Sequence, residues 1–431
     1  MNMETNLLIV GAGPFGLALA AQAKHERIEH LIVGKPMEFW RRQMPKGMFL
    51  RSACDWHLDP QNVHTIECFL KSQGKTASDV EPLSLEFYLS YVEWFQRQKE
   101  IHALPVYIKR IDGVGKDEAV VAKDRALLDS RATAPAPVSA TSPAAAPAPG
   151  LNGPTEDAHF LATTIDGEVI KARHVVLAPG FKHFAHVPED LKTKIPDGCF
   201  HNAGEHACEH TSEFVDFSEA HNKRYLIIGG RQSAFEWAAL LLEAGASAVH
   251  LSHRHPSPAF ATADWSWVNP LVDGMVENPN WFRSLSQVDK DAVSHKLWAE
   301  GRLKVEPWLE SRLRDDRLTV WPETELASCT QRENGALVAT LTNGETLSID
   351  KLVLATGYKV DLTRLPYLAA GNLLPELETR NGFPVLDDHF ETTVPGLFIT
   401  SMPAGQDFGP FFGFTISVRT SAKLICEKVD L

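Results

Sequence analysis

The stretch that decides the fold is Leu7-Leu-Ile-Val10 followed by Gly11-Ala-Gly13-Pro14-Phe15-Gly16. A short apolar strand runs into a turn with glycines at its first, third and sixth positions, and the pattern after it predicts a helix from Phe15 to about Lys24. At such a turn, free backbone N–H groups and the helix dipole stabilise a pyrophosphate. The segment therefore predicts a dinucleotide site.

A second turn of this kind follows the apolar strand Tyr225–Ile228, and it reads Gly229-Gly230-Arg231-Gln232-Ser233-Ala234. One glycine-rich turn is weak evidence, because glycines are common in loops. Two of them, about 220 residues apart and each between a strand and a helix, favour two dinucleotides held face to face. The pair suggests a flavin and a nicotinamide, and hence redox chemistry.

Composition excludes several classes of function. The 431 residues suffice for two or three domains, and 44% hydrophobic and 23% charged residues are ordinary for a globular protein. A net charge of −13 argues against a nucleic-acid partner and an anionic membrane surface. No apolar run is long enough to span a bilayer, and residues 1–6 lack the pattern of a secretory signal. We expect a cytoplasmic protein, and whether it forms a homo-oligomer stays open.

The six cysteines form no Cys-x-x-Cys pair, which argues against a dithiol redox centre. We expect them to be inert core residues. The cluster Cys199, His201, His206, Cys208 and His210 matches no standard zinc spacing, so no metal site is predicted.

The order of the elements predicts an α/β fold with two Rossmann-like dinucleotide-binding domains, one for FAD and one for NADPH. The FAD domain would comprise residues 1–220 and 345–431, interrupted by a mobile Ala/Pro-rich insertion at 130–154. The NADPH domain, residues 221–344, would be inserted into it and carry a helical insertion at 265–315. This insertion holds five of the ten tryptophans, which either form pocket walls or simply pack together.

Further motifs resemble the class B flavin-dependent monooxygenases, in particular their N-hydroxylating branch. The first turn is similar to the family's FAD fingerprint, and Gly229 to Glu236 is similar to its NADPH fingerprint. Ala355-Thr356-Gly357-Tyr358 is similar to the ATGY segment after the inserted domain. Met48 stands where the branch has a methionine near the flavin ring, and Phe200-His201 is similar to its crossover segment.

The resemblance implies a function. NADPH would reduce FAD, O₂ would be activated as a flavin C4a-(hydro)peroxide, and a small nucleophilic substrate would take one oxygen atom. N-hydroxylation is preferred, with oxygenation of sulfur or a carbonyl also possible. The cofactor would perform the difficult chemistry, while the protein orients the reactants and excludes water.

Cofactor selectivity is argued from residues at strand ends. Arg254 follows the strand Ala248–Ser252 and is expected to meet the adenosine 2′-phosphate of NADPH, with Ser252 adding a hydrogen bond. The strand His30–Val33 is followed by Gly34, where a ribose-binding carboxylate is expected, so Lys35 and Trp40 are candidate FAD contacts. Arg231 replaces the middle glycine of the second turn, and we favour its pairing with the pyrophosphate.

The segment after Met48 holds the candidate catalytic residues Arg51, Asp55 and His57, which would hydrogen-bond to flavin, NADP⁺ or substrate. The lysine that binds the substrate carboxylate in ornithine and lysine hydroxylases matches Cys54 here. A thiol forms no ion pair with a carboxylate, so a different substrate is expected.

Two other functions remain open from sequence. One is a flavoprotein reductase without a Cys-x-x-Cys dithiol, which passes its electrons onward instead of to oxygen. The other is a nucleotide-sensing regulatory protein that has lost turnover, for which Gly34 and Arg231 would be the signs.

Overall fold

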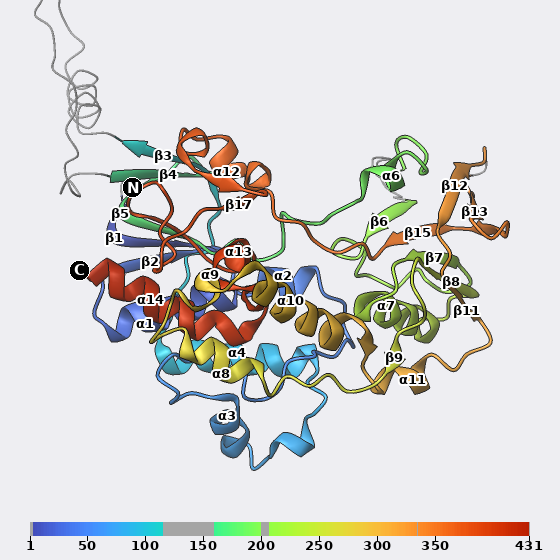
Figure 1. Cartoon of the computed structure of the whole chain (residues 1–431), viewed down its shortest axis with the longest axis horizontal. Helices are drawn as coiled ribbons and strands as arrows, with labels where there is room; N and C mark the ends of the chain where they lie inside the picture. Colours follow the sequence, from blue (N-terminus) through green and yellow to red (C-terminus); the bar gives the residue numbers. More distant parts are fainter. Residues whose placement is uncertain (1–2, 115–158, 200–206, 334, 431) are drawn as a thin grey trace, which may run out of the picture.

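The computed structural model describes residues 3–114, 159–199, 207–333 and 335–430. These residues form two α/β lobes (Figure 1), and each lobe is built on its own sheet, which is mixed in the first lobe and all-parallel in the second. The predicted insertion at 130–154 and the segment Phe200-His201 lie outside the described residues. No helix in the described part of the chain is long and apolar enough to cross a membrane.

The sheet of the first lobe contains β1, the strand that leads into the first glycine turn. Its path is β2 (His30–Val33), β1 (Met3–Val10), β5 (Val169–Leu177), β4 (His159–Thr164) and β3 (Ile108–Val114). β1 lies parallel to both β2 and β5, whereas β3, β4 and β5 form an antiparallel meander. The earlier residues of β5 pair with β4, whereas on the same side its last residues pair with β18 (Leu397–Ile399). The C-terminal part of the chain therefore completes the first sheet.

Helices cover this sheet and form its core. α1 (Pro14–His25) packs against α14 (Val418–Asp430), and α1 is buried along most of its length. α4 (Leu85–Lys99) is preceded by Ser84, whose hydroxyl caps the helix by accepting a hydrogen bond from Phe87 N. Smaller helices of this lobe are α2 (Glu38–Arg42), α3 (Ile66–Ser72), α12 (Pro366–Ala369) and α13 (Gly405–Phe408).

The second lobe contains an all-parallel sheet in the order β11 (Leu318–Pro322), β8 (Ala248–His253), β7 (Arg224–Ile228), β15 (Lys351–Leu354) and β6 (Cys208–His210). α7 (Gln232–Glu243) packs against it. A small antiparallel sheet stands beside it, made of β12 (Leu326–Gln331), β13 (Leu337–Leu341) and β14 (Thr346–Ile349). Since β15 belongs to this lobe, the second domain extends past the predicted boundary at 344.

The helical segment between the lobes differs from the prediction. It comprises α8 (Val268–Gly274), α9 (Trp281–Ser284) and α10 (Gln287–Arg302), drawn in yellow to gold in Figure 1. Val268, Val272 and Met275 are buried in the core of the first lobe. This part of the chain therefore packs on the first lobe, and the chain rejoins the second lobe only at β10 (Lys304–Val305) and α11 (Trp308–Arg312).

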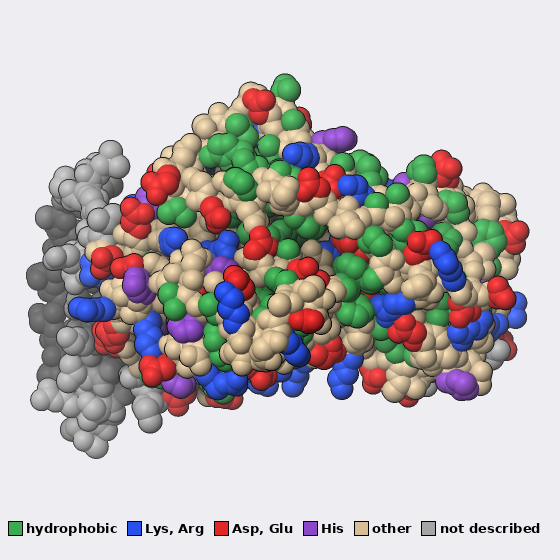
Figure 2. All heavy atoms as spheres, turned by 90° about the horizontal axis from the view of Figure 1, so that it is seen from below, with side chains coloured by type: hydrophobic (Ala, Val, Ile, Leu, Met, Phe, Trp, Pro, Cys, Tyr) green, Lys and Arg blue, Asp and Glu red, His purple; other side chains and the backbone are tan. Residues whose placement is uncertain are grey.

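Charged side chains are spread over the surface. Figure 2 shows acidic and basic groups interspersed on the face that it presents, without one large field of a single sign.

A buried carboxylate fixes the loop that follows the candidate catalytic residues. Asp59 is fully buried, forms an ion pair with Lys99 at 2.6 Å, and accepts hydrogen bonds from the backbone N–H groups of Gln61, Val63 and His64. Burial alone would raise the pKa of Asp59, but Lys99 and the backbone donors outweigh it and lower that pKa.

Asp59→Asn is expected to lower the free energy of unfolding at pH 7 by about 3 kcal/mol, because it removes the negative charge beside the largely buried Lys99 ammonium, which keeps only the neutral Gln61 Oε1 as a side-chain acceptor at 2.7 Å. A lowered folded-state pKa gives stability that is complete above the unfolded-state value of about 3.9 and is lost as the pH falls through the folded-state value. Urea unfolding should therefore show the difference between wild type and variant shrinking below about pH 4. An equal difference at every pH would contradict this assignment.

Candidate active site

The first glycine turn is shaped by backbone contacts that only glycine permits. Gly11 has φ +115°, and a Cβ placed on it would lie 2.4 Å from the carbonyl oxygen of Ala178, at the end of β5. A Cβ on Gly16 would lie 1.8 Å from the carbonyl oxygen of Gly11, so the third glycine lets the helix approach the turn. A Cβ on Gly13, in contrast, would meet nothing within 4 Å.

Gly13 is the residue before α1, and Pro14 occupies the first turn of that helix. The open side of Gly13 thus faces space above the helix N-terminus, where backbone donors and the helix dipole favour an anion. Phe15 is buried in the core beneath. These residues fit the pyrophosphate of a dinucleotide.

The second turn repeats this construction. Gly229 has φ +144°, and its Cβ would lie 2.5 Å from the carbonyl oxygen of Ala355, at the end of β15. The backbone hydrogen bond from Gly229 N to Ser252 O measures 2.9 Å, as does that from Gly11 N to Val33 O. Gly230 packs against His253, since a Cβ there would lie 2.4 Å from the imidazole ring. Two lobes of one chain therefore carry turns of the same geometry.

Arg231 stands before α7, at the place that Gly13 takes before α1. Its guanidinium lies over the indole of Trp298 on α10, 5.3 Å from the ring centre. The extra side chain is thus carried toward α10. Gln232, Ser233 and Ala234 form the first turn of α7, and the pairing of Arg231 with a pyrophosphate stays a prediction.

The other predicted FAD contacts lie between the end of β2 and Met48, and their side chains pack within the first lobe. Trp40 stacks on Tyr88 at 4.9 Å, and the Lys35 ammonium lies 5.3 Å from the ring centre of Tyr107. Gly34 has φ +123° and donates its N–H to Leu104 O. Met48 is partly buried and its carbonyl oxygen accepts a hydrogen bond from Leu85 N.

At the second lobe, Arg254 is exposed directly after β8, as a 2′-phosphate ligand should be. Ser252 is not available for that role, because it is 1% exposed and its hydroxyl donates to Thr324 O at 2.7 Å. Thr356 and Gly357 follow β15, where the Thr356 hydroxyl donates to His186 O and Gly357 takes φ +80°.

Side chains connect the second turn to the segment after Met48. Phe49 N donates to Glu236 Oε1 on α7 at 3.3 Å, and Glu306 N donates to Gln232 Oε1 at 3.0 Å. Arg51 then donates its Nε–H to Glu306 Oε1 at 2.7 Å. Burial raises the pKa of Glu236, and the opposing effect of Arg312 is smaller. This network holds the candidate catalytic segment against the N-terminus of α7.

A cavity of about 490 Å³ lies beside this network. Its lining comes from the segment after Met48, from residues near the start of α8 and from the start of α11, so both lobes contribute. The residues that line it are Leu50, Arg51, Ser52, Ala53, Asp55, Trp56, Glu81, Pro82, Leu83, Thr262, Ala263, Trp265, Ser266, Asn269, Glu306 and Trp308.

Two of the three predicted catalytic residues, Arg51 and Asp55, line this cavity. His57 does not. It is 6% exposed, Arg419 donates to its Nε2 at 2.8 Å, and Asp59 N donates to its Nδ1 at 3.2 Å. Burial, aided by the charge of Arg419, lowers the pKa of His57 to about 3, so the ring is neutral at pH 7. These contacts fit a residue that positions Arg419.

Sequence reasoning missed three lining residues that the structure brings to Arg51 and Asp55: Glu81, Asn269 and Glu306. Glu81 precedes a proline, and Glu306 lies 255 residues from its partner Arg51, so no local pattern marks either. The tryptophan-rich segment did indicate the site, and its tryptophans serve in both of the ways considered, as pocket walls and as packing. Trp265 and Trp308 line the cavity, whereas Trp267, Trp281 and Trp298 pack elsewhere.

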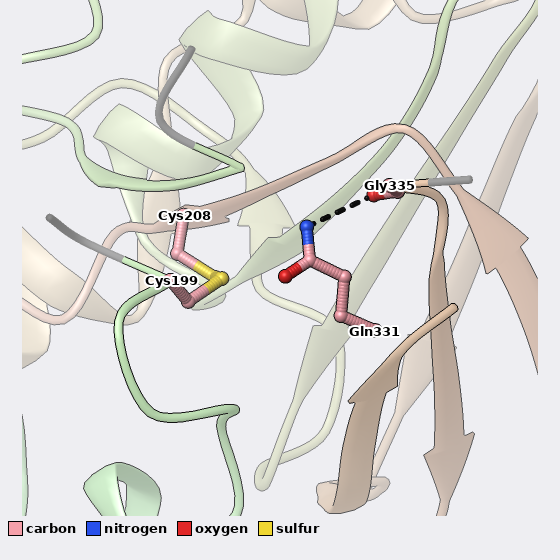
Figure 3. The surroundings of a disulfide bond; sticks show 4 residues. All are labelled: Cys199, Cys208, Gln331 and Gly335. Carbon is pink, nitrogen blue, oxygen red and sulfur yellow. Dashed lines mark hydrogen bonds between the residues drawn. A yellow bond between two sulfur atoms is a disulfide. The ribbon is translucent and has the colours of Figure 1, made fainter. Parts of the chain in front are cut away.

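The cysteines differ from the expectation that they are inert core residues. Cys199 and Cys208 form a disulfide with their Cα atoms 5.3 Å apart (Figure 3), and both are 1% exposed. Their thiolates are therefore not free as metal ligands. A spacing of nine residues is typical of no disulfide motif, so the pattern alone did not indicate this pair. Cys329 and Cys426 are free and buried, whereas Cys68 is exposed.

Comparisons with known proteins place the fold. Residues 154–294 match the family model described as pyridine nucleotide-disulphide oxidoreductase. No curated protein matches the sequence significantly. Among solved structures, the ornithine N-hydroxylase of Kutzneria sp. 744 is 16% identical and has a TM-score of 0.70, with 99% of each chain covered.

The ornithine hydroxylase of Pseudomonas aeruginosa is 16% identical with a TM-score of 0.68, again over 99% of each chain. A bacillithiol disulfide reductase of Bacillus cereus is also 16% identical, with a TM-score of 0.58 over 99% of each chain. The chain thus has the α/β fold with two dinucleotide-binding domains that these flavin enzymes share, as predicted.

Proposed function

We propose that this protein is an NADPH- and O₂-dependent FAD monooxygenase that oxygenates a small nucleophilic substrate, with N-hydroxylation of an amine preferred. The observation that carries the proposal is the pair of matched glycine turns whose second member is tied to a shared cavity through Gln232, Glu306 and Arg51. The likeness to two N-hydroxylases over nearly the whole chain supports it.

The residues present fit the two cofactors. The open side of Gly13 above α1 suits the FAD pyrophosphate, and the start of α7 suits that of NADPH. FAD, when bound, would supply the redox chemistry of the overall reaction R–NH₂ + O₂ + NADPH + H⁺ → R–NHOH + H₂O + NADP⁺.

The chain's own residues would bind, orient and exclude water. Arg51 is 17% exposed and holds its segment to Glu306, which fixes the cavity wall next to α7. Trp56, Trp265 and Trp308 present indole rings to the cavity, and such surfaces displace water from a bound reactant. No acid–base triad is required from the protein, because the cofactor carries the reaction.

Coupled turnover tests this function. The purified FAD-loaded protein would be supplied with NADPH, O₂ and a panel of amines, and NADPH oxidation, hydroxylamine formation and H₂O₂ release would be measured together. A monooxygenase gives hydroxylamine in proportion to the NADPH consumed with at least one amine. NADPH oxidation that passes its electrons to a disulfide or a dye, and never into an oxygenated product, would indicate the reductase instead. A protein that takes up no FAD would refute both.

Arg254→Ala is expected to raise KM for NADPH about tenfold to a hundredfold, because a charge-assisted hydrogen bond to a phosphate contributes about 1.5–3 kcal/mol. NADH lacks the 2′-phosphate, so KM for NADH serves as the control and should not change. Steady-state kinetics with both nucleotides measure this. A similar rise for NADH and NADPH would show that Arg254 does not read the 2′-phosphate.

A further inference from the structure

We propose that the cavity beside Arg51 binds its substrate as an organic cation: an amine on an aromatic or extended apolar body that carries no carboxylate. The proposal rests on the proposed function and goes beyond it by assigning the substrate class and the residues that select it.

The walls are aromatic and held in place. Trp56 is 2% exposed, and its Nε1–H donates to Asn269 Oδ1 at 3.0 Å, which fixes the ring. The rings of Trp56 and Trp265 lie 5.9 Å apart at 58°. Trp308 completes the set, and its Nε1–H has no hydrogen-bond partner among the residues that the structure describes. Fixed indoles suit an apolar or aromatic body and attract a cation to their faces.

Among the lining residues are two exposed carboxylates, Asp55 and Glu81. Asn269 donates its side-chain N–H to Asp55 Oδ2, and Cys54 N donates to Glu81 Oε1 at 3.4 Å. Burial first, and then a hydrogen bond to Glu81 and the negative charges of Glu81 and Asp55, raise the pKa of the neighbouring Cys54 thiol to about 12. The preference for a cation over an anion comes from the two carboxylates themselves, because both Asp55 and Glu81 are lining residues.

Arg51 does not reverse this preference. It is the one cationic side chain among the residues that line the cavity in the described part of the chain. Its guanidinium donates to Glu306 Oε1 and to the carbonyl oxygens of Gly301 and Glu300, so three of its five N–H groups are engaged within the protein. Glu306 balances its charge, and Asp55 and Glu81 remain as two negative charges facing the cavity. A substrate carboxylate would find no unbalanced positive charge among these residues, and Asp55 and Glu81 would repel it.

Paired ligands that differ only in a carboxylate test the proposal. Isothermal titration of the FAD-loaded protein, without NADPH, would compare tryptamine with tryptophan and phenethylamine with phenylalanine. We expect each amine to bind at least tenfold more tightly than its amino acid. Equal or tighter binding of the amino acids would overturn the proposal, as would binding of neither amine.

Variants then assign the selecting residues. Glu81→Gln and Asp55→Asn should each weaken tryptamine binding about tenfold. Each should also reduce the ratio of the Kd of tryptophan to the Kd of tryptamine. Glu277→Gln removes an exposed carboxylate that does not line the cavity, and it should change neither. Trp265→Phe should keep tryptamine binding within about threefold, whereas Trp265→Ala should reduce it about tenfold. An unchanged ratio in both carboxylate variants would overturn the assignment.

This experiment separates the two proposals, because binding is measured without turnover. Selective amine binding by a protein that never oxidises NADPH would refute the proposed function and leave the binding assignment standing. Coupled NADPH oxidation with amino acids but not with amines would refute the assignment and leave the monooxygenase standing.

Discussion

Gly16→Ala is expected to lower the free energy of unfolding by about 3 kcal/mol or more and to abolish FAD binding, whereas Gly13→Ala should only weaken the binding. A methyl group on Gly16 would lie 1.8 Å from the carbonyl oxygen of Gly11, so α1 or the turn must shift. A methyl group on Gly13 meets nothing within 4 Å and the residue has φ −81°, so the polypeptide itself tolerates it. The methyl group would occupy the space assigned to the pyrophosphate.

Urea unfolding of the flavin-free proteins and FAD titration followed by flavin fluorescence measure the two effects. The stability of Gly13→Ala should stay within about 0.5 kcal/mol of the wild type, as for a substitution into open space. Wild-type FAD affinity in Gly13→Ala would contradict the placement of the pyrophosphate. Wild-type stability in Gly16→Ala would contradict the close packing of the turn.

Arg51→Ala is expected to lower the free energy of unfolding by about 3–5 kcal/mol, since it leaves the Glu306 carboxylate, 5% exposed, without its partner. It also removes the hydrogen bonds to Gly301 O and Glu300 O, which connect the segment after Met48 to α10. The large effect comes from the buried Glu306 carboxylate that is left unpaired. Combining Arg51→Ala with Glu306→Gln should therefore recover part of the lost free energy of unfolding.

Arg314→Ala is the matched control. Arg314 pairs with Glu310 at 2.8 Å, but its side chain is 73% exposed, so its loss should change the free energy of unfolding by less than about 1 kcal/mol. Urea unfolding of the FAD-loaded proteins provides the comparison. Equal effects of the two arginine substitutions would show that the ion pair of Arg51 is not a buried link between the lobes.

The parts of the fold that local patterns encode were predictable. The strand His30–Val33 is found at the predicted residues, and the helix predicted from Phe15 to about Lys24 is α1, Pro14–His25, because apolar periodicity acts within a few positions. The two glycine turns were also predictable, because each turn requires glycine at its first position. A Cβ on Gly11 or on Gly229 would collide with a backbone carbonyl oxygen.

What the sequence did not reveal depends on residues far apart in the chain. The Arg51–Glu306 pair joins positions 255 residues apart, and the placement of α8 on the first lobe follows from burial of Val268 and Val272 there. His57 sits in a polar, aromatic stretch that indicated a site, but its ring is turned to Arg419 on α14. Periodicity does not show which lobe a helix covers, nor which way a histidine points.

The most direct test of the central claim is anaerobic mixing of the FAD-loaded protein with NADPH, followed by admission of O₂ in the presence of an amine. We expect NADPH to bleach the visible absorption of the bound flavin. Oxygen should then restore it with formation of one hydroxylamine for each NADPH oxidised. A flavin that NADPH does not reduce, or a protein that holds no flavin, would contradict the assignment of the two glycine turns to FAD and NADPH.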